Sequence, residues 1–403
     1  MTIDFKSEAL AMRDQLVAWR RDFHRHPELA YQEVRTSGIV AKHLADLGIE
    51  VQTGIGKTGV IGVLDGAQPG PVVMIRFDMD ALPIVEANQT EYASLTPGVM
   101  HACGHDAHTA IGMGIAQVLT KHRHRLKGTV KFVFQPAEEG GSGALAMIRD
   151  GALEGPRPDV SMGLHVWNEL PVGRAGVGAG PIMAGAGKFA IRVQGKGGHG
   201  ALPHQTVDSI LVGSAIVSAL QSIVARNVSP RDMAVVSVCS FHAGHAFNVI
   251  ADSAELTGTF RWFRDEVGDL LTRRIHEVAH TIAQSMGATA TAEIIPLTSA
   301  TVNDARTAAW VREDAERVLG AAQVEPEQFT MGAEDMSEFL NRAPGCFFFV
   351  GSRNDARGID APHHHPRFDI DEDALPFGVA ILAQSAARYL SDARRNGAPD
   401  ERA

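Results

Sequence analysis

The sequence predicts an α/β protein in which a layered α/β domain is interrupted by a smaller α+β domain. Apolar strand-like runs alternate with helical patterns over the first half of the chain. A β-α-β-β-α-β order follows in the middle, and the alternating pattern then resumes. The chain has 403 residues, 45% hydrophobic and 21% charged, which suits a folded protein of two or three domains.

The outer domain contains the alternating elements. Helical spacing of apolar residues and apolar runs bounded by Gly or Pro predict these elements in order: helices at 5–24 and 33–47, strands at 57–66 and 71–77, a helix at 106–121, a strand at 129–134, a helix at 144–150 and a strand leading into 163–167. The Gly-rich stretch 171–187 is expected to be a connector. After the insertion we expect a helix near 303–319, a strand at 345–352 and a helix at 373–391.

The inserted domain has a different pattern. It predicts a strand at 188–196, a helix at 206–225, half-buried strands at 234–244 and 254–263, a helix at 264–285 and a strand at 290–296. This order is that of the ferredoxin-like split-βαβ unit. We therefore expect residues 1–186 and 300–403 to form one domain and 187–299 the insertion.

Composition excludes several classes of protein. A net charge of −10 and a pI near 6.0 argue against a broad nucleic-acid or anionic-membrane surface. No run of 18 apolar residues and no signal peptide are found, so neither a membrane span nor secretion is expected. Three cysteines, an odd number, fit a reducing compartment, and a cytoplasmic enzyme is the expectation.

The segment MHACGHDAHTA (100–110) is the first cluster with metal-binding chemistry. Cys103 and His105 stand where a helix begins, and thiolate and imidazole are transition-metal ligands. The helix N-terminus is expected to favour the thiolate form of Cys103. The alternative is a small buried cysteine beside helix-capping histidines.

Two acidic clusters follow predicted strands. Asp78 and Asp80 follow 71–77, and Glu138 and Glu139 follow 129–134. Adjacent buried carboxylates are costly unless cations neutralise them. A metal site gives the glutamates separate roles, one as a ligand and one as the base that deprotonates the attacking water. The alternatives are a loop or helix cap for the aspartates and a solvated turn for the glutamates.

Two further clusters contain histidine. His165 ends another predicted strand, and His363, His364 and His365 stand beside a proline near the C-terminus. Alone, these sites are also explained as a satisfied core histidine and a surface tract. Because four of the five clusters follow strands of one predicted sheet, a pair of metal ions explains them together.

Other motifs are weaker. FHRHPE (23–28) contains His-x-His but lies in a charged amphipathic stretch, and GKGGHG (195–200) lacks the ending of a phosphate-binding loop. Neither G-x-S-x-G nor H-E-x-x-H occurs, so a serine hydrolase or a zincin is unsupported.

The chain resembles the metal-dependent N-acyl-L-amino-acid amidohydrolases, a family with hippurate hydrolases and auxin-conjugate hydrolases in the aminoacylase/carboxypeptidase superfamily. The resemblance extends from about residue 10 to 391 and is carried, in order, by HRHPELAYQE, RFDMDALPI, MHACGHDAHTA, FQPAEEGGSGA, GKGGHGALPH, FNVIAD, GTFRWF, GAEDMSEF and HHPRFD. It implies a catalytic α/β sandwich with a mixed sheet, two divalent ions per subunit (Zn, Mn, Co or Ni) and an inserted domain that serves as lid and dimerisation domain. It also implies a homodimer or a higher homo-oligomer.

The resemblance also implies a ligand set. Cys103 and His105 match the family's Cys-Gly-His-Asp ligands, Glu139 matches the glutamate ligand, and His165 matches the histidine of the next strand. The His-x-Pro context points to His364 as the last ligand, with its two neighbours as alternatives.

Five further roles follow from the resemblance. Glu138 resembles the general base, and Asp80 the aspartate that orients a neighbour of the metal site. His199 resembles a histidine that reaches the partner protomer's site and donates to the developing oxyanion. Asn248 and Arg261 resemble the residues that hold the substrate carboxylate.

The implied reaction is hydrolysis of the amide bond of an N-acyl-L-amino acid (hippurate-like, N-acetyl or indoleacetyl), a small-molecule substrate. A dipeptidase or carboxypeptidase is the alternative enzyme, and Cys103 favours the acyl-amino-acid branch because dipeptidases of this scaffold usually have a carboxylate there. A non-catalytic metal-dependent binding protein is the other alternative, and the presence of Glu138 beside a full ligand set disfavours it.

Overall fold

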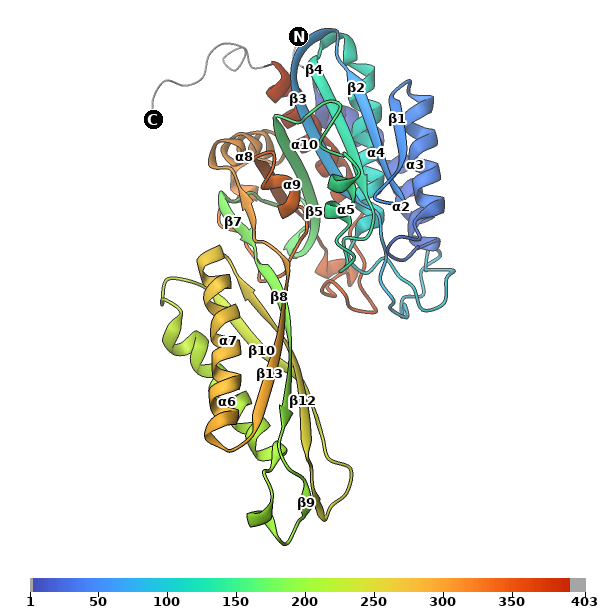
Figure 1. The fold of residues 1–403 in the computed structure, drawn as a ribbon. Helices are drawn as coiled ribbons and strands as arrows, with labels where there is room; N and C mark the ends of the chain where they lie inside the picture. Colours follow the sequence, from blue (N-terminus) through green and yellow to red (C-terminus); the bar gives the residue numbers. More distant parts are fainter. Residues whose placement is uncertain (1–2, 392–403) are drawn as a thin grey trace, which may run out of the picture. The chain divides into compact units, whose positions relative to one another are not determined.

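The computed structural model describes residues 3–391, which form two compact units (Figure 1). Among these residues, unit 1 comprises 3–182, Val302–Phe329 and 335–391, and unit 2 comprises Met183–Thr301 and Thr330–Glu334. Each unit has its own cluster of buried apolar side chains.

Unit 1 is built on a mixed sheet. Within the described residues its strand order is β1-β2-β4-β3-β5-β16-β6-β15. These strands are β1 (Glu50–Ile55), β2 (Gly59–Asp65), β3 (Gln68–Asp78), β4 (Lys127–Gln135), β5 (Val160–Pro171), β6 (Ala175–Gly176), β15 (Val324–Glu325) and β16 (Gly345–Arg353). Strand β3 runs parallel to β4 and β5, and β16 runs parallel to β5. The carboxyl ends of these four strands therefore meet at one edge of the sheet.

Helices of unit 1 surround this sheet, whose long strands β2, β3, β4, β5 and β16 are buried over most of their residues. They are α1 (Phe5–Ala11), α2 (Arg13–Arg25), α3 (Val34–Asp46), α4 (His105–Lys121), α5 (Gly143–Arg149), α8 (Ala305–Leu319), α9 (Ser337–Leu340) and α10 (Ala374–Ser391). Helices α4 and α10 pack on β3, β4 and β5 and on each other. The first two turns of α4 are fully buried, which places its N-terminus inside the protein.

Unit 2 has a separate antiparallel sheet with the order β10-β12-β8-β13 in the residues described. Its elements are β8 (Gly185–Gln194), β9 (Gly198–His199), α6 (Ser209–Asn227), β10 (Ala234–Ala243), β11 (Val249–Ile250), β12 (Ser253–Trp262), α7 (Asp265–Ser285) and β13 (Thr289–Thr298). Helices α6 and α7 pack on each other and on this sheet. Chain order and strand order are those of a ferredoxin-like unit.

Several expected elements differ from the observed ones. The helix expected at 5–24 is two helices, because the backbone of Met12 leaves the helical region at φ −93° and ψ 0°. The Gly-rich stretch 171–187 is more than a connector, since it contains β6, β7 (Gly180–Met183) and the start of β8. Strands β1, β11, β14 (Thr301–Asn303) and β15 were not predicted, because they are short or lack a strong apolar pattern.

Helix α6 is, among the described residues, the one helix long and apolar enough to cross a membrane by length and composition. Its buried side includes Val212, Ile216, Leu220 and Ile223, which belong to the core of unit 2. Ile210 and Leu211 on the same helix are 43% and 58% exposed.

Candidate metal centre

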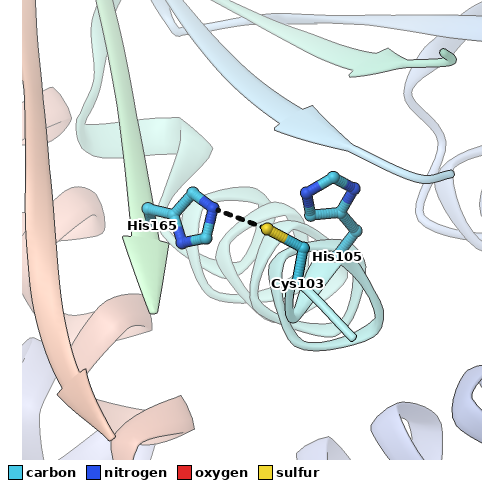
Figure 2. Close-up of side chains that lie close together, drawn as sticks. All are labelled: Cys103, His105 and His165. Carbon is cyan, nitrogen blue, oxygen red and sulfur yellow. Dashed lines mark hydrogen bonds between the residues drawn. The ribbon is translucent and has the colours of Figure 1, made fainter. Parts of the chain in front are cut away.

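The metal-binding candidates of unit 1 meet at the sheet edge where β3, β4 and β5 end. Donor atoms of Cys103, His105 and His165 lie within 4.8 Å of one another, and so do those of Cys103, Glu139 and His364. Figure 2 shows Cys103 and His105 at the start of α4 and His165 on β5, with the Cys103 Sγ 3.5 Å from the His165 Nε2. The structure therefore brings all five expected ligands together.

A tight turn aims Cys103 and His105 at the same point. Gly104, between them, has φ 90°, a left-handed conformation that favours glycine. A Cβ atom there would lie 2.4 Å from the Val166 side chain. The Cys-Gly-His order is thus required by backbone geometry and by the closeness of β5.

Asp80 fixes the orientation of several groups in the centre. Its two carboxylate oxygens accept hydrogen bonds from the backbone N–H groups of Glu138 and Glu139, both at 3.0 Å. One of these oxygens also lies 3.3 Å from the Nδ1 atom of His105, whose Nδ1 is 2.9 Å from the Asp80 carbonyl oxygen. Asp80 thereby directs the other ring nitrogen of His105 inward.

The surroundings of the buried His105 Nε2 atom are those expected of a cation ligand. Within residues 3–391 this atom has no hydrogen-bond partner, which is costly for a buried polar atom unless something else binds it. The centre also contains His165, whose pKa is lowered well below its usual value, chiefly by burial. A neutral imidazole, a cysteine thiolate and a carboxylate are the ligands that divalent transition metals bind.

The three adjacent histidines have different roles in the structure. His364 Nε2 lies 3.0 Å from Glu139 Oε1, and its backbone has φ 64°. His363 turns away, because its Nε2 lies 2.9 Å from the Val166 carbonyl oxygen and its ring stacks on Trp167. His365 Nδ1 accepts the backbone N–H of Arg367. Of the three histidines, His364 is therefore the one whose ring nitrogen faces Glu139.

The expected position of His165 and the expected state of Cys103 need correction. His165 lies inside β5, which continues to Pro171. The helix N-terminus does not leave Cys103 as a thiolate: burial, followed by the charges of Glu139 and Glu138, raises the pKa of its thiol well above the usual value. A bound cation reverses this balance, because it favours the thiolate directly.

His105 is also protonated in the absence of a cation. Burial by itself lowers the pKa of this imidazole, but the carboxylates of Asp78, Asp80 and Glu139 outweigh burial and raise it to about 10. Asp78 has the opposite shift, because His105, His108 and Arg76 outweigh burial and hold the pKa of its carboxyl well below the usual range.

Two buried polar networks surround the centre; the sequence motifs contained Asp78, Asp106 and His108 without assigning them partners. In the first, Asp78 accepts from Arg76 at 2.7 Å and lies 2.5 Å from His108 Nδ1, while His108 Nε2 accepts the backbone N–H of Val166. The Arg76 guanidinium also donates a hydrogen bond to the Asp335 carboxylate at 3.0 Å. His108 therefore links the end of β3 to the residue that follows His165.

In the second network, Asp106 lies 2.8 Å from both Arg20 and His24. Arg20 also contacts Asp369 at 2.7 Å. The signal for His24 was the FHRHPE segment (23–28), and Arg20, four residues before His24, shares one face of α2 with it. That segment was set aside as a charged amphipathic stretch, although both side chains are buried.

The three remaining predicted residues belong to unit 2. His199 and Asn248 are neighbours there: His199 pairs with Val249 across β9 and β11, and the Gly200 N–H donates to the Asn248 carbonyl oxygen at 2.9 Å. Both are exposed. Arg261 lies near the other end of β12, and its guanidinium donates to the Phe260 carbonyl oxygen at 3.0 Å.

Asn248 and Arg261 therefore do not hold one carboxylate within a single unit 2. Asn248 lies beyond the end of β12 that begins at Ser253, and Arg261 is next to its last residue. At about 3.4 Å per residue the two are separated by roughly 25–30 Å along the strand. Sequence order could not reveal this separation, because Asn248 precedes the strand in which Arg261 lies.

Replacing His364 tests the ligand set. His364→Ala should lower the affinity for one of the two ions. The loss should exceed the roughly 10- to 100-fold that follows when a ligand loses its outer hydrogen-bond partner, whereas His363→Ala should retain both ions. Metal stoichiometry after dialysis, measured by elemental analysis, checks this. The reverse pattern would identify His363 as the ligand.

The pKa shifts of Cys103 and His105 predict that cation affinity rises with pH. Without a bound cation both groups are protonated at pH 7, and each must release its proton before it can bind. Between pH 6 and 9 the dissociation constant for Co²⁺ should fall about tenfold per pH unit for each proton released. Calorimetry in buffers of different ionisation enthalpy measures the protons released, and an affinity independent of pH would contradict the assignment.

Comparison with known proteins agrees with this centre. Residues 74–388 match the peptidase family M20/M25/M40. The chain is 41% identical to IAA-amino acid hydrolase ILR1-like 4 of Arabidopsis thaliana over 396 residues, which cover 96% of this chain and 89% of that one. It is 40% identical to N-acetylcysteine deacetylase of Bacillus subtilis (strain 168) over 381 residues, 94% and 98% of the two chains.

A solved structure is also similar to this chain. The Bacillus subtilis YXEP protein, described as a dinuclear metal binding peptidase from the M20 family, matches with a TM-score of 0.82 and 37% identity, covering 94% of this chain and 99% of that one. The family match, over residues 74–388, includes the segments that supply the five candidate donors. The chain belongs to the M20/M25/M40 peptidase family.

Proposed function

We propose that this protein is a metal-dependent hydrolase that cleaves the amide bond of N-acyl-L-amino acids and releases a carboxylic acid and a free amino acid. The observation that carries the proposal is the meeting of Cys103, His105, Glu139, His165 and His364 at one sheet edge, with Glu138 adjacent to a ligand. Relatives named as an IAA-amino acid hydrolase and an N-acetylcysteine deacetylase support amide-linked acyl amino acids as the substrate class.

The five donors are proposed to hold two divalent ions per subunit, and the set accommodates zinc, manganese, cobalt or nickel. When bound, the ions lower the pKa of water and polarise the substrate carbonyl. The thiol of Cys103 must remain reduced to act as a donor, which fits the expected cytoplasmic location.

Glu138 is proposed as the general base. An oxygen of its carboxylate lies within 4.8 Å of His105 and Glu139 donor atoms, which supports a base located beside the proposed ions. It accepts a proton from the attacking water and passes this proton to the nitrogen of the leaving amine. Asp80 holds the Glu138 backbone N–H and thereby keeps the base in position.

A second copy of the chain is proposed to complete the substrate site. Because Asn248 and Arg261 lie at opposite ends of β12, we infer that the two residues serve one substrate from different copies of the chain, and that His199 comes from the same copy as Asn248. Apolar side chains near His199 and Asn248 fit such an association: Phe247 is 102% exposed and Val249 is 55% exposed. The exposed face of α6 adds Ile210 and Leu211.

The activity test uses Glu138→Ala. Turnover of N-acetyl, N-benzoyl and indoleacetyl amino acids should fall by about 10²- to 10⁴-fold, the contribution of a general acid–base residue, while two ions stay bound. Glu169→Ala, at an exposed position on β5, is the matched control and should keep wild-type turnover. Full activity of Glu138→Ala would remove the assigned base.

The same assay also tests the dipeptidase alternative and the requirement for metal ions. Unblocked dipeptides should be poor substrates, and faster cleavage of these than of N-acyl amino acids would favour a dipeptidase. Wild-type protein stripped of divalent ions by a chelator should lose activity and regain it when ions return. Unchanged hydrolysis after stripping would overturn the proposal.

Mixing two inactive variants tests the second copy. Glu138→Ala and His199→Ala should each be nearly inactive alone, because each damages every site. If His199 acts in the neighbouring copy, dissociating and reassociating an equal mixture should restore up to about a quarter of wild-type activity, since a mixed dimer has one site with both residues intact. No recovery, with mixed dimers verified by mass spectrometry, would place His199 and Glu138 in the same copy's site.

A further inference from the structure

The segment 361–372, here called the His364 strap, presents its histidine from an irregular loop of unit 1. His364 has φ 64°, a conformation that costs free energy in a residue with a Cβ and persists only when the surroundings hold it. Its backbone N–H donates to the Ala102 carbonyl oxygen at 2.8 Å. The strap must therefore be held from outside for His364 to face Glu139.

Asn168 contacts the strap on both sides of His364. Its Nδ2 atom donates to the carbonyl oxygen of Ala361 at 2.9 Å and to that of Asp369 at 2.8 Å. Its Oδ1 atom accepts the Ser352 hydroxyl at 2.7 Å. The side chain is buried, with 4% of the residue exposed, and the three bonds together determine which end of the amide carries nitrogen.

Asn168 lies on β5, three positions after His165 and next to Trp167. Strand β5 pairs with β3 over Val160–Gly163 and with β16 over Ser161–Trp167 and again at Pro171, so its backbone is held just before and just after Asn168. Asn168 therefore connects a rigid strand that carries one proposed ligand to a loop that carries another.

Other contacts anchor one side of the strap. The Asp369 side chain accepts from Arg20 and from Tyr92, each at 2.7 Å, and Asn88 donates to the Phe368 carbonyl oxygen at 2.9 Å. These contacts lie on the C-terminal side of His364. The bond from Asn168 to Ala361 ties the N-terminal side to the same point.

We propose that Asn168 is a positioning residue for His364: it closes the strap and so sets the affinity of the ion that His364 binds. The inference rests on the proposed function, because it assigns His364 as a ligand. Loss of the two donated bonds lets the strap sample open conformations. Ion binding must then order the loop, and the entropy cost of this ordering lowers the apparent affinity for the ion.

Two variants test this proposal. Asn168→Asp keeps the shape but replaces the donor with an acceptor facing two carbonyl oxygens, and Asn168→Ala removes the amide. Both should lower the affinity for the ion that His364 binds about 10- to 100-fold, the usual effect of losing a ligand's outer hydrogen-bond partner. The affinity for the other ion should not change. Competition with a chromophoric chelator measures both dissociation constants.

Asn303 offers a matched control in the same unit. It is also a buried asparagine whose amide donates to two carbonyl oxygens, those of Gly178 at 2.8 Å and Phe347 at 2.7 Å, and accepts one N–H. None of its partners is in the strap. Asn303→Ala should lower the melting temperature about as much as Asn168→Ala does, with both ion affinities preserved.

A double variant separates positioning from general destabilisation. If Asn168 acts through His364, Asn168→Asp should cause no further loss of ion affinity in a His364→Ala background. The inference is overturned if Asn168→Asp and Asn168→Ala bind both ions with wild-type affinity, if Asn303→Ala weakens the same ion equally, or if the two losses add. A wild-type protein that binds no second ion would instead contradict the proposed function.

Discussion

The Asp80 carboxylate is the contact on which the centre depends. It joins three separate parts of the chain, because it follows β3, accepts two backbone N–H groups from the loop after β4 and lies beside His105 at the start of α4. Accepting these bonds keeps the Glu138–Glu139 pair and the His105 ring in one arrangement. The adjacent glutamates can therefore serve different purposes, since their backbone directions are already set.

Buried charge is the second constraint. Asp78, Asp106 and Arg20 are fully buried, and each is stable there because oppositely charged or hydrogen-bonding groups surround it. The two networks lie on different sides of α4: one runs from Asp78 through His108 to β5, and the other from Asp106 through Arg20 to the His364 strap. The centre is thus held by its surroundings before any ion is present.

The titration behaviour follows from the same charges. Carboxylates packed near Cys103 and His105 favour the protonated forms of both, so protons partly compensate the negative charge where a cation is proposed to bind. Cation and protons compete for one site, and this competition links occupancy to pH. Unit 2 has a separate role in the proposal, because its exposed His199 and Asn248 lie far along β12 from Arg261.

Sequence alone predicted the α/β class and the β-α-β-β-α-β order, because strand periodicity is a local property of the chain. Its short motifs, through the family resemblance, also proposed Cys103, His105, Glu139 and His165 as metal ligands and left three adjacent histidines as candidates for the last one. Tertiary structure decided what depends on contacts between distant segments. It selected His364 over His363 because only the folded strap shows which ring faces Glu139. It reversed the expected state of Cys103, since burial and the neighbouring glutamates outweigh the helix N-terminus. It also revealed Arg20, His24 and Asn168, whose partners lie far away in the sequence; a polar side chain's function is set by what it meets in space, and spacing along the chain does not encode that.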